Sequence, residues 1–309
     1  MKVLVIGAGG FLGSHICQYF INKGDQVWAL GRFISVTSFC MYCPGIKEVI
    51  EIDLPSPQLR SVLSAVKPDL LVNCASSASV QLSMQDPLSD LRQSVGVYSE
   101  ILDAVRMESP DTTVALTSSA SVYGQPKLLP TPETATVSPL SPYGYHKMMC
   151  ETLSLEYASI FGIKTLNLRI FSAYGERLLK QVIYEILTKI HSPGNRSLDL
   201  YGTGNETRDF IHAQDVAKAI DIIYESGLTG TFNVAAGTPI SIREIAHLLT
   251  QFSNPPREVC FTGKSRPGDP DFWHADISKL QALGFMTEIP ISEGISRVAR
   301  WFKNSALGN

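Results

Sequence analysis

The sequence has no run of the roughly 20 apolar residues that a membrane-spanning helix needs. It also has no surplus of one charge, because 26 Lys and Arg residues oppose 29 Asp and Glu residues. A net charge of −3 provides no general attraction to nucleic acid or to acidic lipid. Residues 2–6 run directly into glycines instead of a longer apolar stretch, so we expect no secretory signal. We therefore expect a cytoplasmic protein that binds neither nucleic acid nor membrane.

Cysteine is scarce, with six residues in the chain. They are Cys17, Cys40, Cys43, Cys74, Cys150 and Cys260. Such a number fits free thiols in a reducing compartment. Cys40 and Cys43 form a CxxC pattern, but no second Cys or His pair lies nearby to complete a tetrahedral metal site. We expect two thiols in a loop and no bound metal.

The composition that remains is that of a packed globular protein, with 44% hydrophobic and 18% charged residues. In residues 1–171, short runs rich in β-branched residues alternate with amphipathic helical stretches. We expect strands at 3–6, 26–30, 49–52, 70–73, 113–117 and 164–170, and helices at 11–23, 56–67, 87–107 and 143–161. This alternation predicts an α/β fold with a doubly wound, Rossmann-type parallel sheet. Residues 1–171 would form the dinucleotide-binding domain.

The pattern becomes irregular after residue 171. Short strands are expected at 198–201, 231–234 and 258–261, and helices at 213–225, 242–252 and 291–303. Several connecting loops are rich in Gly and Pro. We interpret residues 172–309 as a smaller, mixed α/β lobe that closes over the ligand end of the sheet, with some chain shared between the two parts.

A glycine-rich turn joins the first expected strand to the first expected helix. Gly7 permits a tight turn, Gly10 lets a pyrophosphate approach the backbone, and Gly13 lets the helix pack close to the sheet. The helix start then presents free N–H groups and a partial positive charge to phosphates. Glycines at this spacing, between a strand and a helix, predict a dinucleotide site.

The end of the second expected strand bears on which dinucleotide is bound. An enzyme that uses NAD usually carries an acid there for the ribose hydroxyls, whereas this chain has Gly31 and Arg32. A guanidinium can pair with a 2′-phosphate. The residues therefore favour NADP over NAD, although Arg32 as a solvated loop charge leaves both open.

A tyrosine and a lysine lie four residues apart at Tyr143 and Lys147, so that one helix face presents both side chains. Free tyrosine has a pKa of about 10 and is a poor base at neutral pH. An ammonium about 4 Å away favours the phenolate by roughly 4 kcal/mol at an effective dielectric constant of about 20. The phenolate could then take a hydroxyl proton while hydride leaves the same carbon. Ser118 and Ser119, at the end of an expected strand, could bind the substrate oxygen. We expect His146, inside the motif, on the helix surface.

Three segments occur in the order found in the extended short-chain dehydrogenases/reductases: the glycine turn, Ser-Ser-Ala-x-Val-Tyr-Gly at 118–124, and Ser-Pro-Tyr-x-x-x-Lys at 141–147. They most resemble the nucleotide-sugar epimerase/dehydratase branch. The resemblance places the catalytic hydroxyl on Ser119, with Ser118 as the fallback. It makes Tyr143 the acid/base and lets Lys147 also hold the nicotinamide ribose. The resemblance and the glycine turn together assign these further residues to the cofactor: Phe11, Leu12, Asp53, Leu54 and Ala75.

The same resemblance covers the second half of the chain. Arg208 and Arg266 match arginines that contact the diphosphate of a sugar nucleotide, and Asp269 matches a position near its ribose. Ser172 stands where many relatives carry a substrate-binding Asn. Ala120 stands where 4,6-dehydratases begin an Asp-Glu pair, which argues against that reaction.

The leading hypothesis is hydride transfer at C4 of a hexose bound to a nucleoside diphosphate, most simply by a 4-epimerase. An NADPH-dependent 4-keto-6-deoxy-sugar nucleotide reductase is the alternative that Arg32 favours. A non-catalytic cofactor-binding or RNA-associated module would be expected to lack the catalytic Tyr, Lys or hydroxyl, and this chain keeps all three. The resemblance also implies a homodimer that packs through the helices expected at 87–107 and 143–161.

Overall fold

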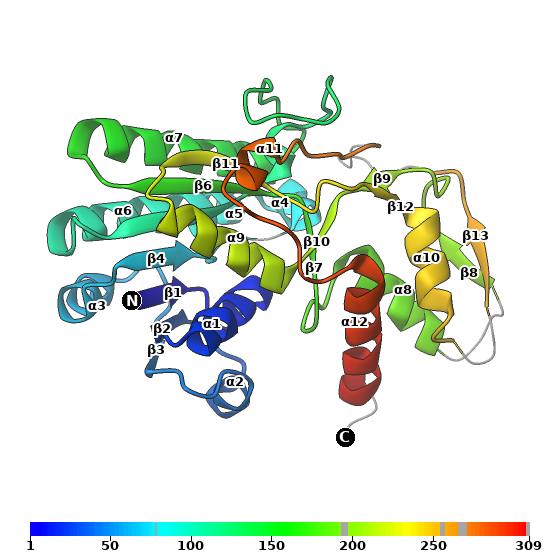
Figure 1. Cartoon of the computed structure of the whole chain (residues 1–309), viewed down its shortest axis with the longest axis horizontal. Helices are drawn as coiled ribbons and strands as arrows, with labels where there is room; N and C mark the ends of the chain where they lie inside the picture. The colour runs from blue at the N-terminus through cyan, green and yellow to red at the C-terminus, as the bar shows by residue number, and fades with distance from the viewer. Residues whose placement is uncertain (78, 193–196, 254–256, 265–270, 307–309) are drawn as a thin grey trace.

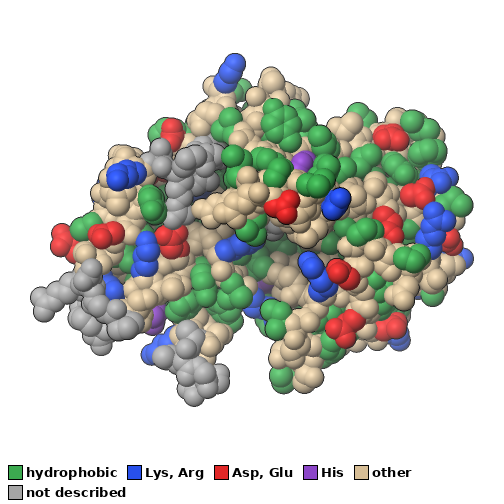
Figure 2. Space-filling model, turned by 180° about the vertical axis from the view of Figure 1, so that it is seen from behind, with side chains coloured by type: hydrophobic (Ala, Val, Ile, Leu, Met, Phe, Trp, Pro, Cys, Tyr) green, Lys and Arg blue, Asp and Glu red, His purple; other side chains and the backbone are tan. Residues whose placement is uncertain are grey.

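The computed structural model describes residues 1–77, 79–192, 197–253, 257–264 and 271–306. A large sheet lies between two layers of helices, and a smaller group of helices and short strands packs beside it (Figure 1). Basic and acidic side chains are interspersed on the face seen from behind, so that no field of one sign covers that face (Figure 2). None of the helices in the described ranges is both long and apolar enough to cross a membrane.

The large sheet has seven strands in the order β11-β6-β5-β4-β1-β2-β3, and every neighbouring pair is parallel. The strands are β1 (Lys2–Ile6), β2 (Gln26–Gly31), β3 (Glu48–Glu51), β4 (Leu70–Asn73), β5 (Thr113–Ser119), β6 (Thr165–Ile170) and β11 (Gly230–Val234). This arrangement confirms the doubly wound parallel sheet. The strand order reverses between β1 and β4, and the carboxyl ends of the strands form a crevice for ligands at such a point.

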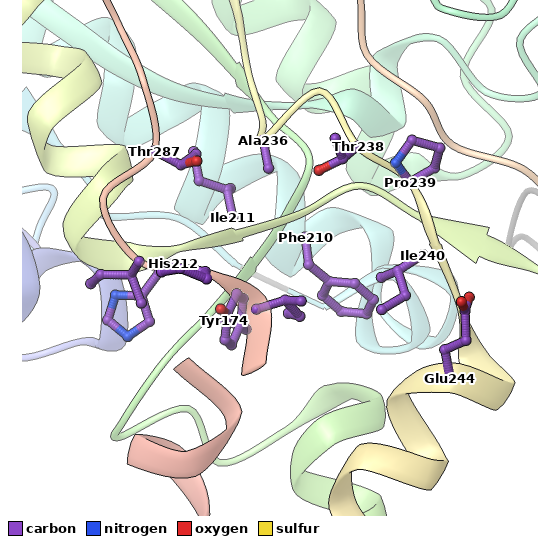
Figure 3. A pocket seen from close by; sticks show the side chains of 13 residues that line it. Tyr174, Phe210, Ile211, His212, Ala236, Thr238, Pro239, Ile240, Glu244 and Thr287 are labelled. Atoms are coloured by element: carbon purple, nitrogen blue, oxygen red, sulfur yellow. The ribbon is translucent and has the colours of Figure 1, made fainter. Parts of the chain in front are cut away.

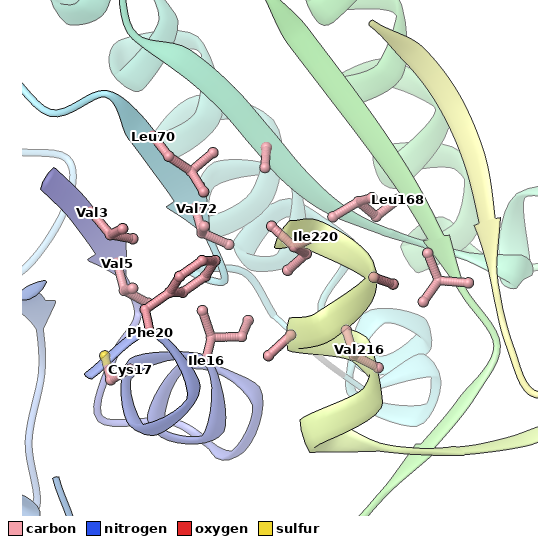
Figure 4. Packing of buried hydrophobic residues seen from close by; sticks show 14 of the residues in the cluster. Val3, Val5, Ile16, Cys17, Phe20, Leu70, Val72, Leu168, Val216 and Ile220 are labelled. Atoms are coloured by element: carbon pink, nitrogen blue, oxygen red, sulfur yellow. The ribbon is translucent and has the colours of Figure 1, made fainter. Parts of the chain in front are cut away.

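The side chains of β1 point alternately to the two faces of the sheet, and each face is covered by a layer of helices. Val3 and Val5 face one core and Leu4 and Ile6 face the other, because successive strand residues point to opposite faces. The first core is closed by α1 (Phe11–Lys23), α2 (Val36–Tyr42) and α9 (Ala213–Glu225), and the second by α3 (Gln58–Val66), α6 (Val97–Glu108) and α7 (Pro142–Phe161). Figure 4 shows Phe20 of α1 packed against the sheet in the first core. Burial on both faces accounts for the nearly continuous apolar runs of these strands.

The helix α2 was not expected from the sequence, and it changes the interpretation of the CxxC pattern. Cys40 lies within α2 and Cys43 ends it, so the expectation of two thiols in a loop is wrong. Cys43 is buried, with its Sγ 3.5 Å from the carbonyl oxygen of Ser14. Burial raises the pKa of the Cys43 thiol to about 12, which keeps it protonated at neutral pH. Within the described ranges no group of three or more His, Cys, Asp or Glu side chains could hold a metal ion.

The single helix expected at 87–107 is divided in the structure. It consists of α5 (Pro87–Leu91), a π-helical turn (Arg92–Gly96) and α6, and a further helix, α4 (Val80–Gln85), precedes it. Asp86 accepts a hydrogen bond from the Ser89 N–H at 2.9 Å and Pro87 occupies the first helical position, which together start α5. A wider turn in mid-helix leaves no signal in a periodicity of 3.6 residues.

The smaller part has its own core between three helices and short strand pairs. Its helices are α8 (Gln181–His191), α10 (Ile242–Thr250) and α12 (Ile291–Ala306). The pairs are β7 (Ser172–Tyr174) with β10 (Phe210–His212), β8 (Ser197–Leu200) with β13 (Glu258–Phe261), and β9 (Thr207–Arg208) with β12 (Ile240–Ser241), while α11 (Ser278–Gln281) packs near β11. Between these elements the chain returns to the large sheet, to which it contributes α9 and β11.

Candidate active site

The turn after β1 has the geometry that the glycine spacing predicts. Gly7 has a φ of +77°, and a Cβ built on it would lie 2.7 Å from the backbone nitrogen of Ala75. A Cβ on Gly13 would lie 2.3 Å from the carbonyl oxygen of Gly7. Neither residue can carry a side chain in this fold. A Cβ on Gly10 would meet only the Gly7 carbonyl, at 3.3 Å, so this position is open toward the crevice.

The start of α1 offers an anion site. Gly10 is the N-cap in an extended conformation, no side chain caps the helix, and its first turn has no acidic residue. The N–H groups of Phe11, Leu12 and Gly13 therefore have no partner within the helix. Free N–H groups and the positive end of the helix dipole suit a phosphate at this point.

The two residues assigned to the adenosine end lie side by side. The Arg32 Nε, after β2, lies 3.6 Å from the Asp53 Oδ1, after β3, and both side chains are exposed. Leu54 follows and packs partly against the second core. Exposed pairs of this kind contribute little to stability, so both groups remain available to a ligand.

Helix α7 starts against the turn that follows β5. The Ser141 hydroxyl accepts a hydrogen bond from the Gly144 N–H at 3.2 Å, which caps the helix one residue before Pro142. A Cβ on Gly144 would lie 2.7 Å from the carbonyl oxygen of Ser121. The absence of a side chain at Gly144 thus lets α7 approach the turn closely and brings Tyr143 to the carboxyl end of β5.

The predicted Tyr-Lys pair shares one side of α7. The Lys147 Nζ lies 5.8 Å from the centroid of the Tyr143 ring. Lys147 is buried, and its ammonium donates to the Thr117 carbonyl at 2.7 Å and to the Ser76 Oγ at 3.0 Å. Sequence reasoning did not find Ser76, which follows β4 without a recognisable motif. The ammonium is thereby fixed at the ends of β4 and β5, next to the Tyr143 ring.

The two candidate hydroxyls differ in their surroundings. The Ser119 Oγ, at the end of β5, donates to the Ser121 Oγ and accepts from the Ser121 N–H, both at 3.1 Å. The Ser118 Oγ donates to the Glu151 Oε1 at 2.6 Å in a buried setting. Successive strand residues face opposite ways, so the hydroxyls do not share a side. Ser118 is committed to the interior, whereas Ser119 lies at the turn against which α7 starts.

His146 is buried, so the expectation of a helix-surface residue is wrong. Its Nδ1 forms a hydrogen bond with the Oδ2 of Asp90, which is also buried. Asp90 belongs to α5, which packs on α7 and covers that face of the helix. Only the packing of these two helices reveals the contact.

The substrate residues predicted in the second half are placed in part. Ser172 lies buried in β7. The Arg208 guanidinium in β9 donates to the Thr207 carbonyl at 2.9 Å and lies 5.5 Å from the centroid of the Trp273 ring. The centroids of the Trp273 and Phe171 rings are 6.0 Å apart. Trp273, whose buried Nε1 has no hydrogen-bond partner among the described residues, was missed because no local pattern marks it. Arg266 and Asp269 lie outside the described residues.

A buried carboxylate holds the segments around Arg208. Asp209 accepts hydrogen bonds from the N–H groups of Ala236 and Gly237, both at 3.0 Å, and of Ala275 at 3.1 Å. Burial raises the pKa of Asp209, and these N–H groups oppose that rise. Asp209 therefore joins the loop after β11 to the segment that carries Trp273.

A cavity of about 300 Å³ lies beside the segments that Asp209 joins, since Phe210 and Ala236 are among the residues that line it (Figure 3). Side chains from β7, β10 and the segments near residues 236–244 and 287–291 line it. None of the predicted catalytic, cofactor-binding or substrate-binding residues is among them. The candidate site is therefore defined by the converging groups at the carboxyl edge of the sheet and not by this cavity.

Comparison with known proteins shows which family the chain resembles. Residues 3–235 match the NAD dependent epimerase/dehydratase family. A Bacillus subtilis protein named uncharacterized UDP-glucose epimerase YtcB is 31% identical over 295 residues, with 92% of each chain covered. The Bacillus cereus UDP-glucuronic acid 4-epimerase, in complex with UDP-glucuronic acid and NAD, is 27% identical with a TM-score of 0.89, and the match covers 99% of this chain and 100% of that one. The Thermus thermophilus UDP-glucose 4-epimerase, in complex with NAD, is 26% identical with a TM-score of 0.87, again over 99% and 100% of the chains.

Fold and site together define an enzyme built on a dinucleotide-binding sheet. The chain belongs to the NAD-dependent epimerase/dehydratase family. The resemblance inferred from the glycine turn and the Tyr-Lys helix is confirmed. The two related structures contain NAD and give no support to the NADP preference predicted from Arg32.

Proposed function

We propose that the protein is a UDP-sugar 4-epimerase that oxidises the sugar at C4 and reduces the product from the opposite face, with its cofactor retained. The observation that carries this proposal is the position of Lys147. Its ammonium is fixed by Thr117 beside the Tyr143 ring, at the strand end that also carries Ser119. The names of the related structures, which are 4-epimerases of UDP-glucuronic acid and UDP-glucose, support the substrate class.

The residues present fit a nicotinamide dinucleotide. Gly7 and Gly13 leave no room for a side chain in the turn, and the start of α1 leaves N–H groups for the two phosphates. Two of the three N–H groups of the Lys147 ammonium serve Thr117 and Ser76, which leaves one for a ribose hydroxyl. When bound, NAD would supply the acceptor and donor of hydride.

Side chains of this protein would transfer the proton and stabilise the developing negative charge. Tyr143, as phenolate, would take the proton of the C4 hydroxyl and later return it. The positive charge of Lys147 favours that phenolate. The Ser119 hydroxyl would exchange its hydrogen bond to the Ser121 Oγ for one to the same sugar oxygen as negative charge develops on that oxygen. Arg208 and Ser172, with Arg266 and Asp269, would hold the nucleotide and the sugar.

Incubation with UDP-glucose, UDP-glucuronic acid and UDP-N-acetylglucosamine tests this proposal. Formation of the C4 epimer without net change in NADH absorbance is expected for one or more of them. A stoichiometric loss of NADPH absorbance with a 4-keto-6-deoxy-sugar nucleotide would instead identify the reductase. Tyr143→Phe is expected to lower kcat by at least about 100-fold, since it removes the acid/base. Turnover by this variant at the wild-type rate would refute the assignment.

The cofactor preference is tested at Arg32. Its guanidinium could pair with a 2′-phosphate, but the Asp53 carboxylate 3.6 Å away opposes a second negative group there. We therefore propose NAD as the resident cofactor and expect NAD to bind more tightly than NADP. A lower dissociation constant for NADP, lost in Arg32→Ala, would restore the preference predicted from the sequence.

We further propose a homodimer formed through α5, α6 and α7. Leu88, Tyr145, Met149 and Leu155 leave large apolar side chains exposed on α5 and α7, and such surfaces typically mark interfaces. Sedimentation should therefore report twice the mass of the chain. Met149→Glu should shift the equilibrium toward monomer, whereas Met286→Glu, at an exposed residue outside these helices, should not. A monomeric wild type would refute the interface.

A further inference from the structure

A buried ion pair lies beneath the candidate site without taking part in the proposed chemistry. Arg169 in β6 donates to Glu151 in α7 through Nη2 at 2.8 Å and through Nε at 3.1 and 3.2 Å. Both side chains are about nine-tenths buried. Burial of two charges is costly unless their hydrogen-bonding groups are well satisfied, and the three contacts meet that condition.

The pair is joined to the catalytic strand by Ser118. Its hydroxyl donates to the Glu151 carboxylate at 2.6 Å, while the carbonyl of the preceding Thr117 accepts from the Lys147 ammonium at 2.7 Å. Lys147 and Glu151 are four residues apart, and such residues share one face of a helix. Two successive residues of β5 therefore bind two successive turns of α7. This double contact fixes the register between the strand that carries Ser119 and the helix that carries Lys147.

A second arm runs from the pair toward the substrate side. The Arg169 Nη1 donates to the Tyr123 hydroxyl at 3.0 Å, and that hydroxyl donates to the Asn233 Oδ1 at 2.7 Å. The Asn233 amide then donates to the carbonyls of Thr131 at 2.9 Å and Asp276 at 3.0 Å. Asp276 lies three residues after Trp273 in the segment that Asp209 also holds. The network thus spans from α7 to the segment beside Arg208.

We propose that Ser118, Glu151, Arg169 and Tyr123 form a positioning network that sets the geometry of Lys147 and Ser119 for the proton transfer. This proposal rests on the proposed function. None of the four side chains reaches the reacting atoms, and each acts through the strand or helix that it holds. The carboxylate of Glu151, saturated by Arg169 and Ser118, is also prevented from drawing the Lys147 ammonium away from Tyr143.

Ser118→Ala tests the network with a small change. It removes one of the two contacts between β5 and α7, and it leaves both the Thr117–Lys147 contact and the ion pair intact. We expect kcat to fall about tenfold, with KM changed by less than about twofold, which corresponds to about 1.4 kcal/mol of transition-state stabilisation. Ser154→Ala is the matched control, because it removes another buried hydroxyl of the same region, in α7, that pairs with Tyr98 at 2.7 Å. The control should lower the melting temperature similarly and leave kcat unchanged.

Affinity for NADH, measured by fluorescence titration, gives a readout that needs no sugar. Because Lys147 would hold the nicotinamide ribose, Ser118→Ala should weaken NADH binding about fivefold, whereas Ser154→Ala should not. If the wild type turns over no UDP-sugar, the proposed function is wrong. The NADH titration still tests the positioning network in that case, because it needs no sugar substrate. Ser118→Thr keeps the hydroxyl and should restore both kcat and NADH affinity.

The network is refuted if Ser118→Ala changes kcat and NADH affinity no more than Ser154→Ala does. It is also refuted if Ser118→Thr is as impaired as Ser118→Ala, because packing rather than the hydrogen bond would then matter. Should Ser118→Ala fail to fold, Tyr123→Phe replaces it, with Tyr98→Phe as its control. Each of these removes one hydroxyl from a buried tyrosine. The same pattern is expected, and equal effects in the two variants would overturn the proposal.

Discussion

His15 should make the stability of the protein fall as the pH is lowered below neutrality. The side chain lies in α1, two residues after Gly13, and is fully buried. Its Nε2 is 2.8 Å from the Glu176 carbonyl oxygen and its Nδ1 is 3.3 Å from the Tyr42 hydroxyl. A neutral ring satisfies both contacts by donating to the carbonyl and accepting from the hydroxyl. Burial lowers the pKa of His15 from 6.5 to about 4.

The lowered pKa of His15 determines whether the free energy of unfolding rises or falls with pH. Because the pKa of His15 is lower in the folded state, the unfolded chain binds more protons between pH 6.5 and about 4. Stability is therefore complete above that window and is lost as the pH falls through it. Between about pH 7.5 and about pH 5 the expected loss is about 2 kcal/mol. At lower pH a second group contributes. Burial raises the pKa of Glu176, but its hydrogen bonds, chiefly the one with His212, outweigh burial and lower that pKa to about 2.

Urea unfolding across this pH range tests the assignment. Wild type should lose about 2 kcal/mol between the two limits, and His15→Gln should lose much less, because glutamine can donate to the Glu176 carbonyl without titrating. His247→Gln, at an exposed position of α10, serves as the control and should keep the wild-type dependence. If His15→Gln retained the full pH dependence, another group would be responsible and the reasoning about His15 would be wrong.

Further predictions concern the glycine turn and the core. Gly13→Ala should strongly lower the melting temperature, since its Cβ would lie 2.3 Å from the Gly7 carbonyl oxygen. Gly10→Ala should leave the melting temperature nearly unchanged but weaken NAD binding in a calorimetric titration by about tenfold, because its methyl group would occupy the phosphate side of the turn. Equal effects of the two variants on folding would contradict this distinction. Phe20→Ala should lower the free energy of unfolding by about 3–5 kcal/mol in urea denaturation, because it opens a cavity between α1 and the sheet, and a loss below about 1 kcal/mol would show that the site collapses.

The alternation of strands and helices could be predicted because its causes are local. Strands buried on both faces give short apolar runs, and amphipathic helices repeat every 3.6 residues. The seven-residue helix α2 was missed because it buries little more than Phe39, so it has no apolar stripe. The three-residue strands β7 and β10 were missed for a related reason, since they exist only as each other's partner.

In the candidate site, too, the local motifs could be predicted from the sequence and the contacts between distant segments could not. The glycine turn and the Tyr-Lys motif could each be recognised because each is a short, continuous stretch of sequence. The structure brings the two motifs to one edge of the sheet. Only the resemblance favoured Ser119 over Ser118, because from the residues alone the choice depends on which face of β5 meets Glu151. The burial of His146 depends on how α5 packs against α7, and Trp273 gains its place only through contact with Arg208 and Phe171. Contacts between distant segments leave no periodic signal in the sequence.

The return of the chain to the large sheet has a consequence for how the protein can be divided. β11 completes the sheet by pairing with β6, although 59 residues separate the two strands along the chain. A fragment ending at residue 171 would keep β6 but expose its backbone as an open edge, beside Leu166 and Leu168, which α9 no longer covers. Such an edge invites pairing with other chains. The part built on the large sheet and the smaller part are therefore interlaced, and a fragment ending at residue 171 cannot be exchanged between relatives without also carrying β11 and α9.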